Sequence, residues 1–100
     1  GLGQLRILSL QKNQIANVPS HIADMSNLTD LNLEHNSLAE VNKRIAELTL
    51  LRNVNLGHNM LTMLPPMMHM GQMVWRHVKD LRLHNNDFVQ FPHVVCEMHT

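Results

Sequence analysis

Residues 28–38 read LTDLNLEHNSL, and the spacing of the apolar residues in this stretch decides the fold. Leu31 and Leu33 alternate with the polar residues at positions 30, 32 and 34. Alternation with a period of two is typical of a β-strand, whose successive side chains point to opposite faces. One face of this strand is therefore predicted to be apolar and buried, and the other polar and exposed.

The same pattern occurs four times along the chain. It starts at Leu5, Leu28, Leu51 and Val78, so that successive repeats begin 23, 23 and 27 residues apart. Agreement at about five positions in four places does not arise by chance. The sequence therefore predicts one domain over residues 1–100, with short parallel strands at 7–9, 30–32, 53–55 and 80–82. Its four repeats are residues 5–27, 28–50, 51–77 (with a four-residue insertion) and 78–100, called repeats one to four below.

Each predicted strand is followed by a return segment long enough to bring the next strand alongside it in parallel. One repeat cannot bury its own apolar face, and stacked neighbours complete the core. The return segments are bulkier than the strands, so the stack should curve. The expected fold class is α/β: a curved solenoid with a parallel β-sheet on the concave face and short helical or irregular return segments on the convex face.

The L-x-x-L-x-L-x-x-N-x-L pattern, followed by Leu64-Pro65 or Phe91-Pro92, resembles the leucine-rich repeat family over essentially the whole chain. The second half of each repeat is similar to the 23-residue intracellular type of the Ras-group and Scribble-like proteins. The resemblance implies a right-handed solenoid that binds other proteins. The sequence departs from the pattern at Asn42, where the family has proline, and in the insertion of repeat three.

One asparagine stands at the same position of every repeat, where the chain turns inward after the strand. Buried backbone groups at such a turn need partners, and an asparagine amide offers both donors and an acceptor. We therefore predict a structural ladder rather than a binding site. Its members are Asn13, Asn36, Asn59 and Asn86.

The insertion lies between Met68 and Trp75, because counting back from Val78 places Trp75 at the position of Met25 and Leu48. Pro66 can occupy the first turn of a helix. Apolar or small residues then recur at helical spacing, which predicts a longer helix on the convex side. Surface insertions often carry recognition, so a second contact patch is the alternative to simple packing. The residues at this spacing are Met67, Gly71, Val74 and Val78.

Composition excludes several function classes. Lys plus Arg equals Asp plus Glu at 8 each, which argues against nucleic acid and anionic membranes as partners. No apolar run approaches the roughly 20 residues that span a bilayer. The chain does not open on a signal-peptide pattern. Gly1 leads directly into repeat sequence, so we expect the chain to start inside a longer protein. Cys96 is the single cysteine, which precludes an internal disulfide and favours a reducing, cytoplasmic compartment.

Catalysis and metal binding have candidates but no motif. The eight histidines occupy different repeat positions, and no nucleophile, phosphate-loop or H-E-x-x-H motif accompanies them. His35 and His58 share a column of adjacent repeats, and zinc could add only Glu34 and His84. Residues 67–73 are rich in methionine, which would suit Cu(I). In each case a surface or packing role is preferred. We therefore predict no catalytic residue, no metal and no cofactor, and we expect that the protein is not an enzyme.

The strand side chains that face away from the core are predicted to form the binding surface. The predicted function is a protein–protein interaction module of an intracellular signalling or scaffolding protein, and the family resemblance suggests a small GTPase, phosphatase or kinase as partner. Alternatives are the recognition domain of a larger enzyme or immune sensor, such as a kinase, ubiquitin ligase or NTPase, or a pathogen protein binding a host factor. An engineered protein is disfavoured because the repeats are uneven. The predicted partner-binding residues are Ile7, Ser9, Gln11, Asp30, Asn32, Glu34, Asn53, Asn55, Gly57, Asp80, Arg82 and His84.

Four of these residues carry more specific expectations. Gly57 should leave a gap that a bulky partner side chain could fill. Arg82 should dominate the binding energy, because arginine is enriched at such positions. The paired change Asn32→Arg and Asn55→Arg should block binding while the melting temperature stays nearly unchanged.

Overall fold

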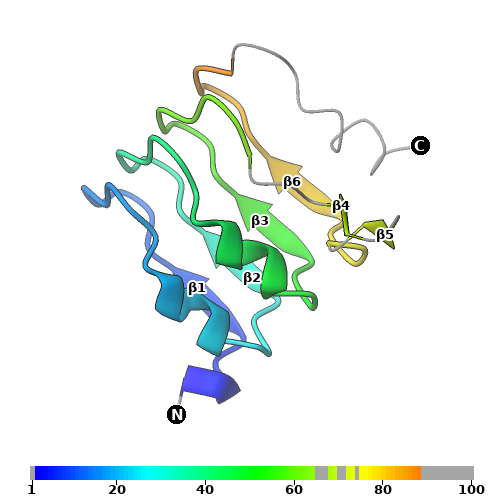
Figure 1. Ribbon diagram of the computed structural model, residues 1–100. Helices are drawn as coiled ribbons and strands as arrows, with labels where there is room; N and C mark the ends of the chain where they lie inside the picture. The colour runs from blue at the N-terminus through cyan, green and yellow to red at the C-terminus, as the bar shows by residue number, and fades with distance from the viewer. Residues whose placement is uncertain (1, 65–67, 70–71, 74, 89–100) are drawn as a thin grey trace.

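A computed structural model describes residues 2–64, 68–69, 72–73 and 75–88. Four strands of three residues each form one parallel sheet in the order β1-β2-β3-β6 (Figure 1). Equivalent residues of successive repeats pair in register, so that Leu8 faces Leu31 and Val54 faces Leu81. The strands are β1 (Ile7–Ser9), β2 (Asp30–Asn32), β3 (Asn53–Asn55) and β6 (Asp80–Arg82), as the apolar alternation predicts.

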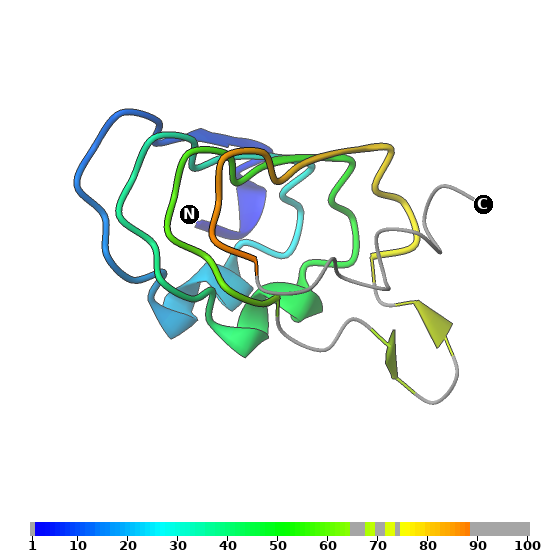
Figure 2. The same ribbon diagram turned by 90° about the horizontal axis from the view of Figure 1, so that it is seen from above.

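The return segments of repeats one and two cross the opposite side of the core as short 3-10 helices. The helices η2 (Ser20–Asp24) and η3 (Lys43–Glu47) lie side by side, facing the sheet across the core (Figure 2). Each buries one isoleucine, Ile22 or Ile45. A further helix, η1 (Leu2–Gln4), precedes the first strand. The architecture is the predicted α/β solenoid, with the sheet on one side and the return segments on the other.

Burial depends on having a neighbouring repeat on both sides. Leu31 and Val54 in the two middle strands are 2% and 1% exposed. Leu8 and Leu81, at the same position of the outer strands, are only half-buried. The densest part of the core therefore lies in repeats two and three, which supply most of the fully buried leucines.

The asparagine column joins consecutive repeats through side-chain to backbone hydrogen bonds. Asn59 is 7% exposed, and its Oδ1 accepts a hydrogen bond from the N–H of Leu38 in the preceding repeat at 3.0 Å. Its Nδ2 donates to the carbonyls of Leu33, Leu56 and Gly57. Asn36 and Asn86 make the equivalent bonds one repeat earlier and one repeat later.

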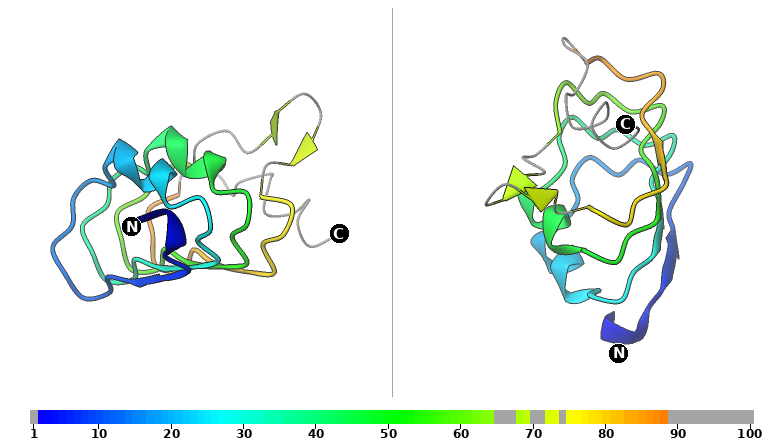
Figure 3. Two further views of the ribbon diagram at one scale, coloured as in Figure 1. Left: turned by 90° about the horizontal axis from the view of Figure 1, so that it is seen from below. Right: turned by 90° about the vertical axis from the view of Figure 1, so that its right-hand side faces the viewer.

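The helix predicted in the insertion is wrong. Met68–His69 (β4) and Gln72–Met73 (β5) pair as antiparallel strands, and the pair projects on the side where η2 and η3 lie (Figures 2 and 3). A helix of this length is marginal because so few hydrogen bonds offset its nucleation, and an internal glycine costs roughly a further 1 kcal/mol. Met67, Gly71 and Val74, on which the helical spacing depended, lie outside the described residues.

Trp75 returns the chain to the core after the insertion, at the position that Leu48 holds in repeat two. Its side chain is 1% exposed, and its Nε1 donates a hydrogen bond to the carbonyl of Ile45 in η3 at 3.1 Å. Despite the four extra residues, β6 pairs with β3 in the same register as β3 pairs with β2. Within the described part of the chain, no helix has the length and apolar character needed to cross a membrane.

Candidate functional site

The face of the sheet that points away from the core is hollowed. The hollow has a volume of about 260 Å³ and runs across all four strands. Its walls are formed mainly by alternate residues of each strand, as the period-two alternation requires. Of the predicted binding residues, it is lined by Ile7, Ser9, Asp30, Asn32, Asn53, Asn55, Asp80 and Arg82.

This concave hollow combines carboxylates, one guanidinium and one exposed apolar side chain. Arg82 donates from Nε and Nη2 to the two carboxylate oxygens of Asp80, each at 3.3 Å. The Arg82 side chain nevertheless stays 59% exposed, so its remaining donors face solvent. Asn53 donates to the Asp30 carboxylate across the strands at 3.4 Å. Ile7 is 62% exposed, which leaves an apolar contact at one end of the hollow.

Two of the predicted binding residues also accept hydrogen bonds from the backbone two residues further along the chain. The Asn32 Oδ1 accepts a hydrogen bond from the N–H of Glu34 at 3.0 Å. Asn55 does the same for the N–H of Gly57, also at 3.0 Å. Changing these asparagines removes a backbone partner as well as a surface contact, a consequence that the alternation pattern does not reveal.

A row of cations precedes the strands and was missed by the sequence analysis. Arg6, Arg52 and Lys79 each stand directly before a strand and are exposed. The signal was present in the alignment of the repeats, because three of the four carry a cation at this position. We call these three residues the basic edge. A second hollow of about 340 Å³ adjoins it, lined by Arg6, Asn27, Thr29, Leu50, Arg52 and His77.

Beyond the other end of the strands, one residue of each repeat adopts the left-handed backbone conformation. The φ angles are 60° for Lys12, 56° for His35, 54° for His58 and 56° for Asn85. Backbone hydrogen bonds hold the column in place, for example from the N–H of His35 to the carbonyl of Gly57 at 3.0 Å. The side chains of this column therefore leave the backbone at matching positions, one repeat apart.

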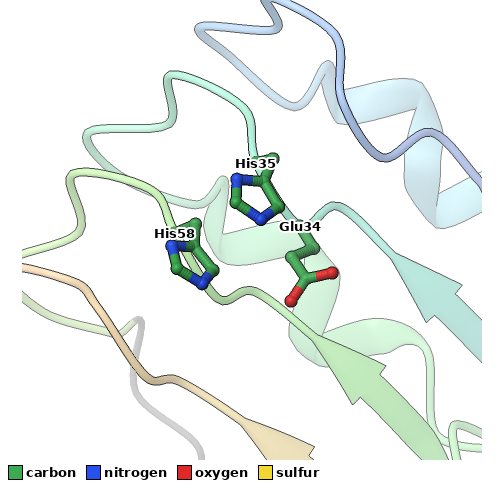
Figure 4. A group of neighbouring side chains, drawn as sticks. All are labelled: Glu34, His35 and His58. Atoms are coloured by element: carbon green, nitrogen blue, oxygen red, sulfur yellow. The ribbon is translucent and has the colours of Figure 1, made fainter.

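The histidines of this region gather into a cluster. The His35 and His58 rings are stacked, with centroids 4.0 Å apart and planes 10° apart, and His84 meets His58 edge-on with centroids 5.0 Å apart. The His84 Nε2 lies 3.3 Å from the Glu34 Oε2. Figure 4 shows the two stacked imidazoles with the Glu34 carboxylate beside them. We call Glu34, His35, His58 and His84 the histidine cluster.

The gap predicted at Gly57 is filled from within the protein. A Cβ added to Gly57 would lie 2.6 Å from the Cε1 of His84, so the imidazole of His84 occupies the space that a partner side chain was expected to enter. Because Gly57 has no side chain, His84 of repeat four reaches across repeat three to Glu34 of repeat two. The prediction is wrong because it took account of the missing side chain at Gly57 but not of the length of the His84 side chain in the next repeat.

Donor atoms of the cluster are close enough to share an ion. Three donor atoms, one each from Glu34, His35 and His58, lie within 4.8 Å of one another. These three residues and His84 are the possible zinc ligands that the repeat spacing brings together, although no metal was predicted there. The methionine-rich candidate for Cu(I) cannot be placed in the same way, since Met67 and Met70 lie outside the described residues.

Comparison with known proteins matches the chain to one family. The family model described as leucine rich repeat matches residues 3–66, which include β1, β2 and β3 with the return segments between them. A search of curated proteins found no match to the sequence.

Proposed function

The chain belongs to the leucine-rich repeat family, and from that membership we propose that it binds another protein through the concave hollow and the basic edge. Leucine-rich repeats generally serve to bind proteins and are typically not catalytic. The observation that carries the proposal is the polar outer face of the sheet. Parallel sheets are usually covered on both faces, yet the polar residues Ser9, Asn53 and Arg82 are exposed here.

The chemistry of the surface favours a folded partner of mixed charge. Asp30 and Asp80 supply negative charge within the hollow, and Arg82 supplies positive charge beside them. The basic edge adds a row of cations along one side. Complementary charges of this kind speed association and select among partners more than they raise affinity, while Arg82 and the exposed Ile7 provide the groups that can dominate the binding energy.

The finer proposal is that the chain serves an intracellular signalling or scaffolding protein in the cytoplasm. Its support is the similarity of the repeats to the Ras-group type and the single cysteine. The same similarity suggests a small GTPase or a phosphatase as partner. We propose no catalytic role, since none of the groups lining the hollow forms a nucleophile and base pair.

Site-specific photo-crosslinking tests which face binds. A photoreactive residue is placed at Ser9 or Asn53 on the concave face and, as matched controls, at the exposed positions Ser20 and Lys43 of the return segments. We expect one protein to be captured from both concave positions and from neither control. Capture of a partner from Ser20 and Lys43 alone would contradict the assignment and move the site to the convex side.

A further inference from the structure

We propose that the histidine cluster is a binding site for a divalent transition metal, with zinc as the ion that fits it best. This departs from the sequence-based expectation of no metal. The cluster lies beyond the strand ends, next to the concave hollow but outside its lining residues. The proposal does not depend on the protein-binding function, and its test needs no partner.

The types of donor atom in the cluster match those that bind zinc. Zinc is held by imidazole nitrogen and carboxylate oxygen, usually with four ligands in a tetrahedron. The cluster supplies three imidazoles and one carboxylate. Glu34 and His35 come from repeat two, His58 from repeat three and His84 from repeat four, so that an ion would join three repeats.

Proximity is the second argument. Glu34, His35 and His58 each place a donor atom within 4.8 Å of the other two, and the His84 Nε2 is 3.3 Å from the Glu34 carboxylate. In a tetrahedral zinc site, neighbouring donor atoms are about 3.4 Å apart for bonds of about 2.1 Å. The stacked rings are nearly parallel, so their lone pairs do not yet converge. Turning the rings about their side-chain torsions would bring them together.

The backbone around the cluster holds the ligands in place, which is the third argument. His35 and His58 both start from the left-handed conformation, and hydrogen bonds between repeats anchor both residues. Gly57 has no side chain to block His84. The cluster is also open to solvent, since the Glu34 side chain is 26% exposed and that of His84 46%. An ion could therefore reach the donor atoms.

Asn85 is placed to orient His58. Its side-chain Nδ2 lies 3.0 Å from the His58 Nε2. Turning the amide over about its terminal torsion would bring its oxygen to this position, where it would accept a hydrogen bond from the Nε2–H. That bond would hold His58 in the tautomer whose Nδ1 carries the lone pair, and partners of this kind orient the ligand and raise its basicity.

Calorimetric titration of the purified chain with zinc chloride tests the proposal. We expect saturable binding of a single ion per chain, together with a rise in melting temperature, because an ion that binds only the folded state stabilises it. The test variant is His35→Asn with His58→Asn. Asparagine is chosen because Asn85 already occupies this column with a φ of 56°, so the backbone is preserved. Affinity should fall by more than about 100-fold, since even outer partners are worth about 10- to 100-fold.

The matched control is His21→Asn with His77→Asn, which removes two exposed histidines outside the cluster and should leave the affinity unchanged. A second variant, Gly57→Ala, removes no donor but displaces the His84 ring from Glu34. It should weaken binding by about tenfold or more and alter the visible absorption of bound Co²⁺, the tetrahedral probe. Zinc affinity that is unchanged in the His35→Asn, His58→Asn variant, or no saturable binding by the parent chain, would overturn the proposal.

Discussion

Asn59 shows how a polar side chain comes to stabilise an apolar core. Its amide oxygen and nitrogen satisfy backbone groups of repeats two and three at once. Among the described residues, no buried side-chain nitrogen or oxygen is left without a hydrogen-bond partner. Removal of the amide would take away the partner of the Leu38 N–H and leave the Leu33 carbonyl with the bond from Asn36, and an unpaired buried polar group is costly.

We therefore expect Asn59→Ala to lower the free energy of unfolding by about 1–3 kcal/mol. Asn13→Ala is the matched control, because Asn13 is exposed and its side-chain bonds to described residues go only to Leu10 and Gln11 of its own repeat. Urea unfolding of both variants measures the difference. If both variants lose the same free energy of unfolding, the hydrogen bonds between repeats do not account for the stability that the asparagine column provides.

At the scale of elements, η2 and η3 begin in different ways. Pro19 precedes η2 with φ −68° and makes no side-chain cap. Asn42 precedes η3 with φ −55°, and its side chain accepts a hydrogen bond from the N–H of Arg44 at 2.9 Å. The departure from the family pattern at Asn42 thus exchanges a rigid backbone for a capping hydrogen bond.

Two substitutions separate these contributions. Asn42→Ala loses the cap without gaining rigidity and should cost about 1 kcal/mol of unfolding free energy. Asn42→Pro loses the cap but restricts the unfolded chain, which returns about 0.4–1 kcal/mol where the φ angle is compatible. The proline variant should therefore be the more stable of the two in urea unfolding. The opposite order would mean that the backbone before η3 does not accept proline.

Helix η3 also carries an ion pair with a pH signature. The hydrogen bond and charge of Arg44, whose Nε lies 2.9 Å from the Glu47 Oε2, lower the pKa of Glu47 from its ordinary value of 4.5. A carboxyl with a lowered pKa contributes stability above its unfolded pKa and loses it as the pH falls through the folded pKa. The contribution is small because both side chains are exposed.

The expected effect of Arg44→Gln is a rise in the pKa of Glu47 towards 4.5. An NMR titration of the Glu47 carboxyl measures this shift, and His21→Gln on η2 is the control that should leave it unchanged. If Glu47 titrates identically in the Arg44 variant and the parent chain, the ion pair does not persist in solution.

At the scale of the whole molecule, stability is concentrated where repeats have neighbours on both sides. Leu31 is 2% exposed, and Leu31→Ala should cost about 2–5 kcal/mol, as large-to-small changes in cores do. Leu8 holds the same position in the outer strand β1 but is half-buried. Leu8→Ala should cost clearly less. Thermal or urea unfolding compares the two, and equal losses would contradict the dependence on stacking.

The binding surface also needs to be tested at this scale, with variants that spare the fold. Ile7→Glu with Arg82→Glu changes two exposed side chains of the concave hollow and should abolish partner capture with little effect on the melting temperature. The pair Asn32→Arg and Asn55→Arg is a poorer choice, because both asparagines bond to their own backbone. We now expect it to lower the melting temperature as well. Normal partner capture by the Ile7, Arg82 variant would place the binding site elsewhere.

Sequence spacing alone was enough to place the four strands of the parallel sheet and to assign their side chains to its two faces. The reason is that a period of two, seen four times, leaves the backbone few choices: Leu31 must face the core if Asn32 faces out. The same counting placed Trp75 at the position of Leu48, since a looped-out insertion does not alter the spacing to Val78. Regular backbone structure can be predicted from the sequence because it follows from local geometry.

The contacts that side chains make between repeats depend on how the repeats stack in space. His84 reaches Glu34 because the space above Gly57 is free, and the hairpin of β4 and β5 forms where local spacing favoured a helix. These outcomes depend on side-chain length, torsion angles and the room left by a residue 27 positions away. Spacing along the chain carries no such information, so the histidine cluster becomes visible only when the repeats are stacked.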